Sequence, residues 1–120
     1  MDFSIYQSMK KLFASLLLVS ASANSYAQID GNMLHQLCSS TSESNKTSCS
    51  LYIRGVLDAS IAIEAFHKIP RKQQLMCMPG DVTFSQMIDV AKNYLRDHPE
   101  ERHKGAMALI VNSMAKFDCE

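Results

Sequence analysis

The sequence lacks the short motifs by which many enzymes and nucleic-acid-binding proteins are recognised. Its 4 glycines are scattered, so it contains neither a phosphate-cradling glycine loop nor a Gly-x-Ser-x-Gly turn. Its 12 Lys and Arg residues are balanced by 12 Asp and Glu residues, whereas proteins that bind nucleic acid carry a basic excess. These absences argue against a nucleotide-dependent enzyme, a serine hydrolase and a nucleic-acid partner.

Clustered metal ligands are also missing. His98 and His103 are five residues apart with Pro99 between them, so they do not share a helical face as residues four apart do. His35 and Cys38 share a face, but we expect Cys38 to be oxidised. The chain has no Cys-x-x-Cys motif, which argues against the alternative of a thiol oxidoreductase. We therefore predict no metal, no cofactor and no catalytic residue, and expect that the protein is not an enzyme.

The N-terminus predicts a secretory signal peptide. Lys10 and Lys11 precede the apolar run 12–19, and small residues follow up to Ser25-Tyr26-Ala27. A basic region, an apolar region and a small-x-small site in this order are typical of a signal peptide. The run is shorter than the roughly 20 apolar residues that span a bilayer. A buried amphipathic first helix is the alternative.

We predict cleavage after Ala27, with Ala23 as the second option, so that the signal peptide is 1–27 and the mature domain is 28–120. Met9 is the better start codon, because it places both lysines directly after the initiator. Cleavage removes two lysines and one aspartate, which changes the net charge from 0 to −1. The mature protein is then expected in the periplasm, with no membrane attachment.

All four cysteines follow the predicted cleavage site: Cys38, Cys49, Cys77 and Cys119. An even number of cysteines in an exported chain indicates disulfides rather than thiols. A domain of this size buries a modest core, so these covalent links are expected to matter for its stability.

The best-defined helix is predicted after the turn Pro79-Gly80. Thr83 and Gln86 have the spacing of a capping box, in which each side chain bonds to the backbone of the other residue. Apolar residues then repeat at helical spacing as far as Leu95. Pro99 ends the helix, because the residue before a proline avoids the helical conformation.

A shorter first helix is predicted over 30–40, with Asp30 as its N-cap. The segment 39–48 is rich in Ser, Thr and Asn and is expected to be a loop. Thr47 or Ser48 would then cap the second helix.

The second helix, from about 48 to 67, carries the largest apolar surface. Its predicted inner stripe extends to Ile63 and to Phe66 or His67. Additional apolar residues widen that stripe and are predicted to form a homodimer face: Leu51, Leu57 and Ile61. Gly55 costs about 1 kcal/mol in a helix interior relative to Ala, which predicts a close helix crossing at that position.

The last helix is predicted to begin at the acidic residues 100–101, since negative charge favours a helix N-terminus, and to end near Phe117. No alternating pattern indicates a strand. The fold class is therefore all-α, a small bundle of four to five helices stapled by two disulfides. Short connections make neighbouring helices antiparallel.

The helix order predicts the disulfide pairing. Cys38 ends the first helix and Cys49 begins the second, so these ends meet in an antiparallel hairpin. Cys77 opens the third helix and Cys119 closes the fourth, so these ends meet as well. Of three possible connectivities, we predict 38 with 49 and 77 with 119.

Two exposed segments are candidates for binding a partner. The first is a basic loop that contains Lys68, Arg71 and Lys72. The second is a charged turn between the third and fourth helices, with the candidate residues Asp97, His98, Glu100, Glu101 and Arg102. Solvated turns without a function are the alternative, but loops held by covalent links also suit partner binding.

Several short motifs occur together in a fixed order along the chain. They are Tyr52-Ile53-x-Gly55-Val56-x-Asp58-Ala59, Cys77-x-Pro79-x-x-Val82-Thr83-x-x-Gln86, Tyr94-Leu95-x-x-His98-Pro99-Glu100 and the terminal Cys119. With the signal peptide, this combination resembles the Rap/Tai family of type VI secretion immunity proteins, over nearly all of residues 34–119. Many relatives end in Pro-Cys, whereas Phe117-Asp118-Cys119 is followed here by Glu120.

The resemblance implies a small helical periplasmic protein that neutralises a peptidoglycan amidase injected by sibling or rival cells. It further implies a homodimer that engages two effector molecules, each a Cys/His hydrolase, and inhibits them by blocking the substrate groove. The alternative is a periplasmic chaperone or stress-binding module with no single partner.

Overall fold

The computed structural model describes residue 4 and residues 28–119, so the predicted signal peptide and Glu120 lie outside the described part, apart from residue 4. Within residues 28–119, four α-helices follow one another: α2 (Gly31–Ser39), α3 (Glu43–Phe66), α4 (Phe84–Asp97) and α5 (Ala106–Ser113). Short 3-10 turns occur at η2 (Arg71–Gln73), η3 (Pro99–Glu101) and η4 (Met114–Lys116). Within the described ranges there is no strand, only an isolated bridge between Asp30 and Gly105. The predicted all-α class is confirmed.

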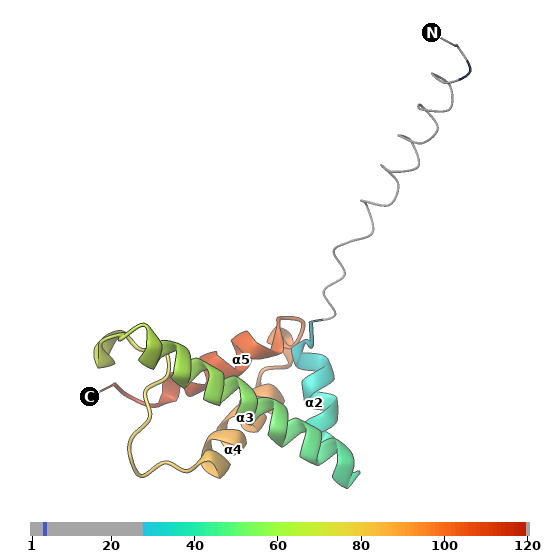
Figure 1. Cartoon of the computed structure of the whole chain (residues 1–120). Helices are drawn as coiled ribbons and strands as arrows, with labels where there is room; N and C mark the ends of the chain where they lie inside the picture. Colours follow the sequence, from blue (N-terminus) through green and yellow to red (C-terminus); the bar gives the residue numbers. More distant parts are fainter. Residues whose placement is uncertain (1–3, 5–27, 120) are drawn as a thin grey trace.

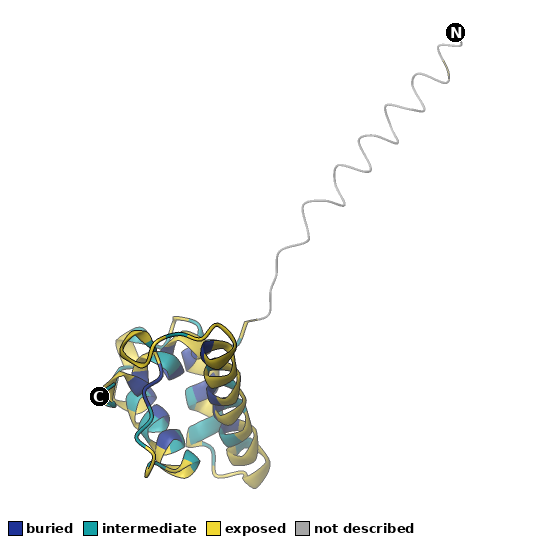
Figure 2. Cartoon of the chain, turned by 60° about the vertical axis from the view of Figure 1, so that its left-hand side comes forward, coloured by how far each residue is buried: buried dark blue, intermediate teal, exposed yellow. Residues whose placement is uncertain are grey.

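Every pair of the four helices is in contact. The long helix α3 crosses the molecule, with α2 at one end and α5 and α4 behind it (Figure 1). Their inner faces form a single core in which Leu34, Ile53, Leu95 and Ile110 are almost completely buried. In Figure 2 the outer side of α3 is exposed along its length, while its inner side is buried.

Two of the three predicted helix caps, at Asp30 and at Thr83, are confirmed. The Asp30 carboxylate accepts a hydrogen bond from the Met33 amide at 2.8 Å. Thr83 and Gln86 form a complete capping box, with bonds of 3.2 Å and 2.7 Å between side chain and backbone. Each satisfies N–H groups that have no partner within the helix.

The second helix begins earlier than predicted. α3 starts at Glu43, with Ser42 as its N-cap, so residues 43–48 are helical rather than part of a loop. Local contacts explain the difference: Lys46 pairs with Glu43 at 2.8 Å, and the Ser48 hydroxyl donates to a backbone carbonyl one turn earlier. The hydroxyl side chains bond within the helix, although they also favour turns.

The predicted start of the last helix is wrong. Residues 99–101 form the turn η3, and α5 begins only at Ala106. The intervening backbone bonds to the N-terminal segment instead: the Gly31 amide donates to Lys104 and the Asn32 amide donates to Arg102, both at 2.9 Å. These tertiary bonds use carbonyls that a continuous helix would need.

Both predicted disulfide pairings are confirmed. Cys38 is linked to Cys49, with their Cα atoms 5.1 Å apart, and Cys77 to Cys119, with their Cα atoms 4.9 Å apart. Cys49 lies inside α3 rather than at its start. The first link therefore fixes α2 against α3, and the second joins the segment before α4 to the end of the chain.

The inner face of α3 differs from the prediction towards its C-terminal end. Leu57 is fully buried in the core, so it cannot contribute to the predicted dimer face. Ile63 and Phe66 are exposed, whereas Glu64 is buried. Apart from the neighbouring backbone of α3 itself, no atom among residues 28–119 lies within 4 Å of the position where a Cβ on Gly55 would sit, so the predicted close crossing does not occur within that range.

Candidate functional site

We name the segment 97–104, between α4 and α5, the charged tip. The Tyr94 hydroxyl donates a 2.5 Å hydrogen bond to the Glu101 carboxylate, which also accepts from the Lys104 ammonium at 3.1 Å. The bond to Glu101 raises the pKa of Tyr94 to about 12, and it lowers the pKa of Glu101. The His98 ring lies on the Tyr94 ring, with 4.3 Å between their centres.

Arg102 holds the charged tip on the end of α4. Its guanidinium donates to the backbone carbonyls of Leu95 at 2.5 Å and Arg96 at 2.9 Å. These are carbonyls of the last helical turn, where a positive charge also complements the helix dipole. Arg102, one of the predicted partner-binding residues, therefore has a structural role.

The other predicted residues of the charged tip also form ion pairs or hydrogen bonds with nearby side chains. Asp97 pairs with Arg96 at 2.8 Å, and this bond lowers the pKa of the Asp97 carboxyl. Glu100 pairs with the His98 ring at 3.1 Å. The structure thus brings the five tip residues together, but it uses their charges largely within the tip itself.

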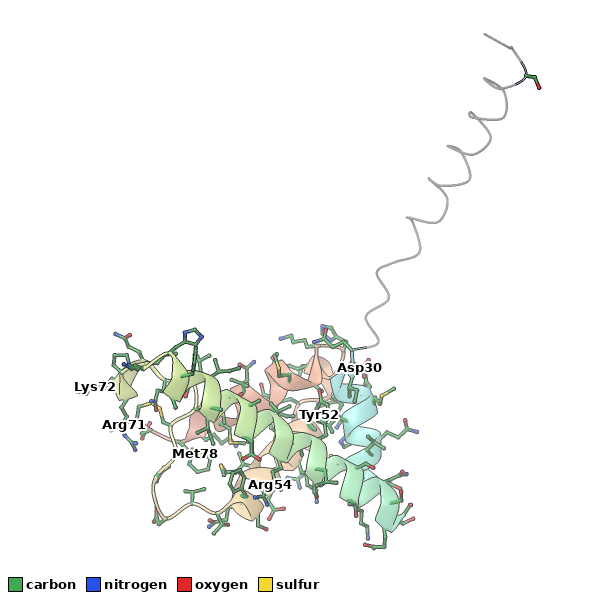
Figure 3. All side chains as sticks on the ribbon, in the orientation of Figure 1. Asp30, Tyr52, Arg54, Arg71, Lys72 and Met78 are labelled. Atoms are coloured by element: carbon green, nitrogen blue, oxygen red, sulfur yellow. A yellow bond between two sulfur atoms is a disulfide. The ribbon has the colours of Figure 1, made fainter. Side chains whose placement is uncertain are left out.

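We name the second group, Lys68, Arg71, Lys72 and Lys116, the basic end. Figure 3 shows Arg71 and Lys72 at the end of the molecule away from Asp30. α3 ends at Phe66, and Lys68 follows in the left-handed conformation with a φ of 52°. All four basic residues are exposed.

The segment after α3 folds back onto that helix. The Glu64 carboxylate accepts hydrogen bonds from the backbone amides of Leu75 at 2.6 Å and Met76 at 3.2 Å. The Ile69 amide donates to the Glu64 carbonyl at 3.1 Å. The basic segment is therefore anchored at both ends on one residue of α3.

The second disulfide lies directly against this segment. The Sγ atoms of Cys77 and Cys119 are each 3.4 Å from the Gln74 carbonyl oxygen. A hollow of about 490 Å³ beside it is lined by Arg71, Pro79, Lys116, Phe117 and Asp118. Lys116 thus joins the basic loop from the C-terminal segment. The pairing of Cys77 with Cys119 is the sequence signal for this proximity, because it brings the C-terminal segment to the basic loop.

The two candidate surfaces differ in how their charges are neutralised. The side chains of Lys68 and Lys72 make no hydrogen bond or ion pair with any other described residue. Most charged side chains of the charged tip are paired, whereas Lys68 and Lys72 of the basic end present unpaired positive charge to solvent. Leu75 lies in the same segment and is 73% exposed, an apolar feature that the sequence analysis missed.

A further hollow, of about 260 Å³, lies between α2 and α4. Its walls are His35, Cys38, Ser39, Asp89, Lys92, Asn93 and Arg96. Burial and the nearby charge of Arg102 lower the pKa of His35.

Residues 28–119 contain no group of three or more His, Cys, Asp or Glu side chains arranged to hold a metal ion. No helix in the same range has the length and apolar character needed to cross a membrane.

Comparison with known proteins supplies the context for these surfaces. A family model described as Rap1a immunity proteins matches residues 30–119. The chain belongs to the Rap1a immunity protein family. It is therefore an immunity protein against a secreted effector, and membership of this family implies a non-enzymatic inhibitor. No curated protein matches the chain, and no solved structure matches it.

The family match covers all four helices, both disulfides and both candidate surfaces. An immunity protein binds its cognate effector, so its function depends on an exposed surface. Of the surfaces described above, the basic end is the one that contains two lysines, Lys68 and Lys72, whose side chains make no hydrogen bond or ion pair with another described residue.

Proposed function

We propose that this Rap1a family protein acts in the periplasm, where it binds a type VI secreted peptidoglycan amidase and blocks its substrate groove. The amidase would be a Cys/His hydrolase, and the chain would protect its producer from self or sibling intoxication. The observation that carries the proposal is the family match over the whole described domain. The motif combination noted in the sequence supports the amidase as the target.

The two disulfides of the chain are consistent with the proposed action in the periplasm. Disulfides persist in oxidising compartments such as the bacterial periplasm, and all four cysteines are paired. The predicted signal peptide would deliver the chain there. Peptidoglycan is exposed in the same compartment, so the inhibitor and the amidase would meet where the damage occurs.

The decisive experiment measures peptidoglycan hydrolysis by the amidase encoded beside this chain. We expect one equivalent of the mature chain to abolish turnover, and we expect cells to be protected only when the chain carries its signal peptide. A chain lacking residues 1–27 but expressed at the same level is the control. Full amidase activity at stoichiometric excess of the chain would refute the proposal.

The outward face of α3 supports the proposed homodimer. Leu51 and Phe66 are 64% and 83% exposed, and between them lie the exposed small residues Gly55, Ala59 and Ala62. All five lie on the side of α3 that faces away from the core, because the buried residues repeat on the opposite side. The dimer face is therefore proposed on different residues from those predicted, with Leu51 as the shared member.

The outward face of α3 can pack against the same face of a second copy, with large residues opposite large ones and small residues opposite small ones, in one antiparallel alignment. If two α3 helices pair antiparallel about the midpoint of 58 and 59, Leu51 meets the Phe66 of a second copy and Gly55 meets its Ala62. Small residues then allow close approach in the middle, and large residues close the contact at both ends. Such a pairing has the two-fold symmetry that most dimers adopt.

The dimer is tested by placing a large charge where the helices would cross. Gly55→Arg has space in the isolated chain, so we expect a folded monomer by size exclusion with light scattering. Asn112→Arg, on the exposed side of α5, is the matched control and should remain a dimer. A wild-type chain that is strictly monomeric at micromolar concentration would remove the proposed dimer.

Exposed apolar residues also favour the alternative of a periplasmic chaperone, because Ile63, Phe66 and Leu75 are all exposed to solvent. A chaperone would slow the aggregation of several unrelated reduced proteins at stoichiometric concentration. We expect no such protection from the wild-type chain. General protection without amidase inhibition would favour the chaperone.

A further inference from the structure

Resting on the proposed function, we infer that the basic end is the surface that docks onto the effector and that it fits an acidic face of that protein. Lys68 and Lys72 provide the charge, and the exposed Leu75 of the same segment provides an apolar contact. The hollow beside Arg71 and Lys116 can receive a side chain from the effector.

The first observation is uncompensated charge. Lys68 and Lys72 have no hydrogen-bonding or ion-pairing group among the described residues, although the whole chain has equal numbers of acidic and basic residues. The nearby carboxylate of Glu64 is buried and bonded to two backbone amides. Positive charge that the fold leaves unpaired is available for a partner of opposite sign, which steers encounter and selects the partner.

The second observation is the backbone conformation of Lys68. A φ of 52° is favoured by glycine and disfavoured for side chains with a Cβ. Glycine is the usual residue at this position after a helix. Strained residues of this kind occur at binding and switch sites, where the side chain has a use that offsets the strain. A lysine in this conformation therefore indicates a role for its ammonium group.

The third observation is rigidity. The Glu64 carboxylate holds the backbone of Leu75, and the link between Cys77 and Cys119 lies against Gln74. A segment fixed in this way loses little conformational freedom on association. The exposed Leu75 side chain, in the same segment as these lysines, resembles the apolar part of a protein interface whose rim is polar. A flat anionic membrane would use the charges but would not need the hollow of about 490 Å³.

The test measures binding of the amidase encoded beside this chain to purified full mature protein. In the variant Lys68→Glu/Lys72→Glu we expect Kd to rise by about tenfold or more, mainly through slower association, with a weaker dependence on salt. The control Lys46→Glu/Lys92→Glu makes the same change in net charge elsewhere and should stay within about twofold of wild type. Equal effects in both variants would overturn the inference.

A second variant separates binding from folding. Lys68→Gly removes the ammonium group but suits the left-handed backbone. We expect an unchanged or higher melting temperature together with a higher Kd for the amidase. Wild-type affinity in Lys68→Gly would overturn the role of this lysine.

Two further outcomes distinguish this inference from the proposed function. If the wild-type chain does not inhibit the amidase, both fail. If it inhibits normally and Lys68→Glu/Lys72→Glu inhibits equally well, only the docking surface fails. Binding of the wild type to phosphatidylglycerol vesicles, lost in Lys68→Glu/Lys72→Glu while amidase inhibition is kept, would assign the basic end to a membrane.

Discussion

The Glu64 carboxylate accepts a 2.6 Å hydrogen bond from the backbone amide of Leu75, eleven residues further along the chain. The same oxygen accepts from Met76 at 3.2 Å. Glu64 is the only charged residue in the buried part of the described core, and its charge is compensated by backbone dipoles. It therefore fixes the basic segment to α3 by a contact that no pattern of apolar residues specifies.

Replacing Glu64 tests this contact. Glu64→Ala leaves the amides of Leu75 and Met76 without an acceptor, and we expect the free energy of unfolding to fall by about 3 kcal/mol. Glu64→Gln keeps a carbonyl acceptor and should lose only about 1 kcal/mol. Urea denaturation measures both values. Equal losses in the two variants would contradict the assignment of the effect to these hydrogen bonds.

The two disulfides should contribute unequally to stability. The link between Cys77 and Cys119 spans 42 residues of sequence, and the link between Cys38 and Cys49 spans 11. Loop-closure entropy predicts losses of about 4 kcal/mol for Cys77→Ser/Cys119→Ser and about 3 kcal/mol for Cys38→Ser/Cys49→Ser. Chemical denaturation of the two double variants measures the order. The reverse order would show that native-state contacts outweigh chain entropy.

Local chemistry made much of the fold predictable from the sequence. The N-cap at Asp30 and the capping box of Thr83 and Gln86 depend on residues within three positions of each other, and both were predicted correctly. The disulfide pairing was also correct, because helix order alone decided which ends meet. Its premise for Cys49 was inexact, since that residue lies two turns inside α3.

Long-range contacts explain the errors. α5 begins late because backbone groups of Arg102 and Lys104 bond to the start of α2, which no local pattern indicates. Apolar periodicity could not tell that Leu57 faces the core and Phe66 faces solvent, because α3 carries apolar residues on both sides. The basic loop was recognised from composition, but its anchoring by Glu64 required the structure.

The proposed dimer and the proposed docking surface are geometrically compatible. Antiparallel pairing of two α3 helices would place the basic end of one copy and that of the second copy at opposite ends of the dimer. Each copy could then bind one effector molecule without obstructing the other. The resulting complex would contain two copies of each protein, the stoichiometry expected from the family resemblance.

Tyr94→Phe tests whether the charged tip stabilises the fold. Loss of the hydrogen bond to Glu101 should lower the free energy of unfolding by about 1 kcal/mol at neutral pH. Because the pKa of Tyr94 is raised to about 12, this contribution is present below pH 10 and is lost as the pH rises through about 12. Tyr52→Phe is the control, since the Tyr52 hydroxyl has no hydrogen-bonding group among the described residues. A loss as large in Tyr52→Phe would contradict the prediction.

His35 should make the fold sensitive to mild acid. Its pKa is lowered by burial and by the charge of Arg102, so the unfolded chain takes up a proton at a higher pH than the folded chain. The free energy of unfolding should therefore fall as the pH drops below about 6.5, the ordinary histidine pKa. We expect this fall to be shallower in His35→Gln and unchanged in the control His67→Gln, measured by thermal melts between pH 5 and 8. Identical curves for wild type and His35→Gln would refute the prediction.

Gly31 is required by the close approach of α2 to the charged tip. Its amide donates to the Lys104 carbonyl at 2.9 Å, and a Cβ at this position would come within 2.8 Å of the Arg102 carbonyl oxygen. Because backbone cannot move aside as easily as a side chain, Gly31→Ala should cost about 1–3 kcal/mol. Gly80→Ala is the matched control, since a Cβ there meets no atom within 4 Å and the φ of Gly80 is not positive. We expect it to be neutral or to stabilise the fold by up to about 1 kcal/mol, because alanine restricts the unfolded chain. Urea denaturation of both variants measures the difference, and equal stabilities would show that α2 can shift away from Arg102 without loss.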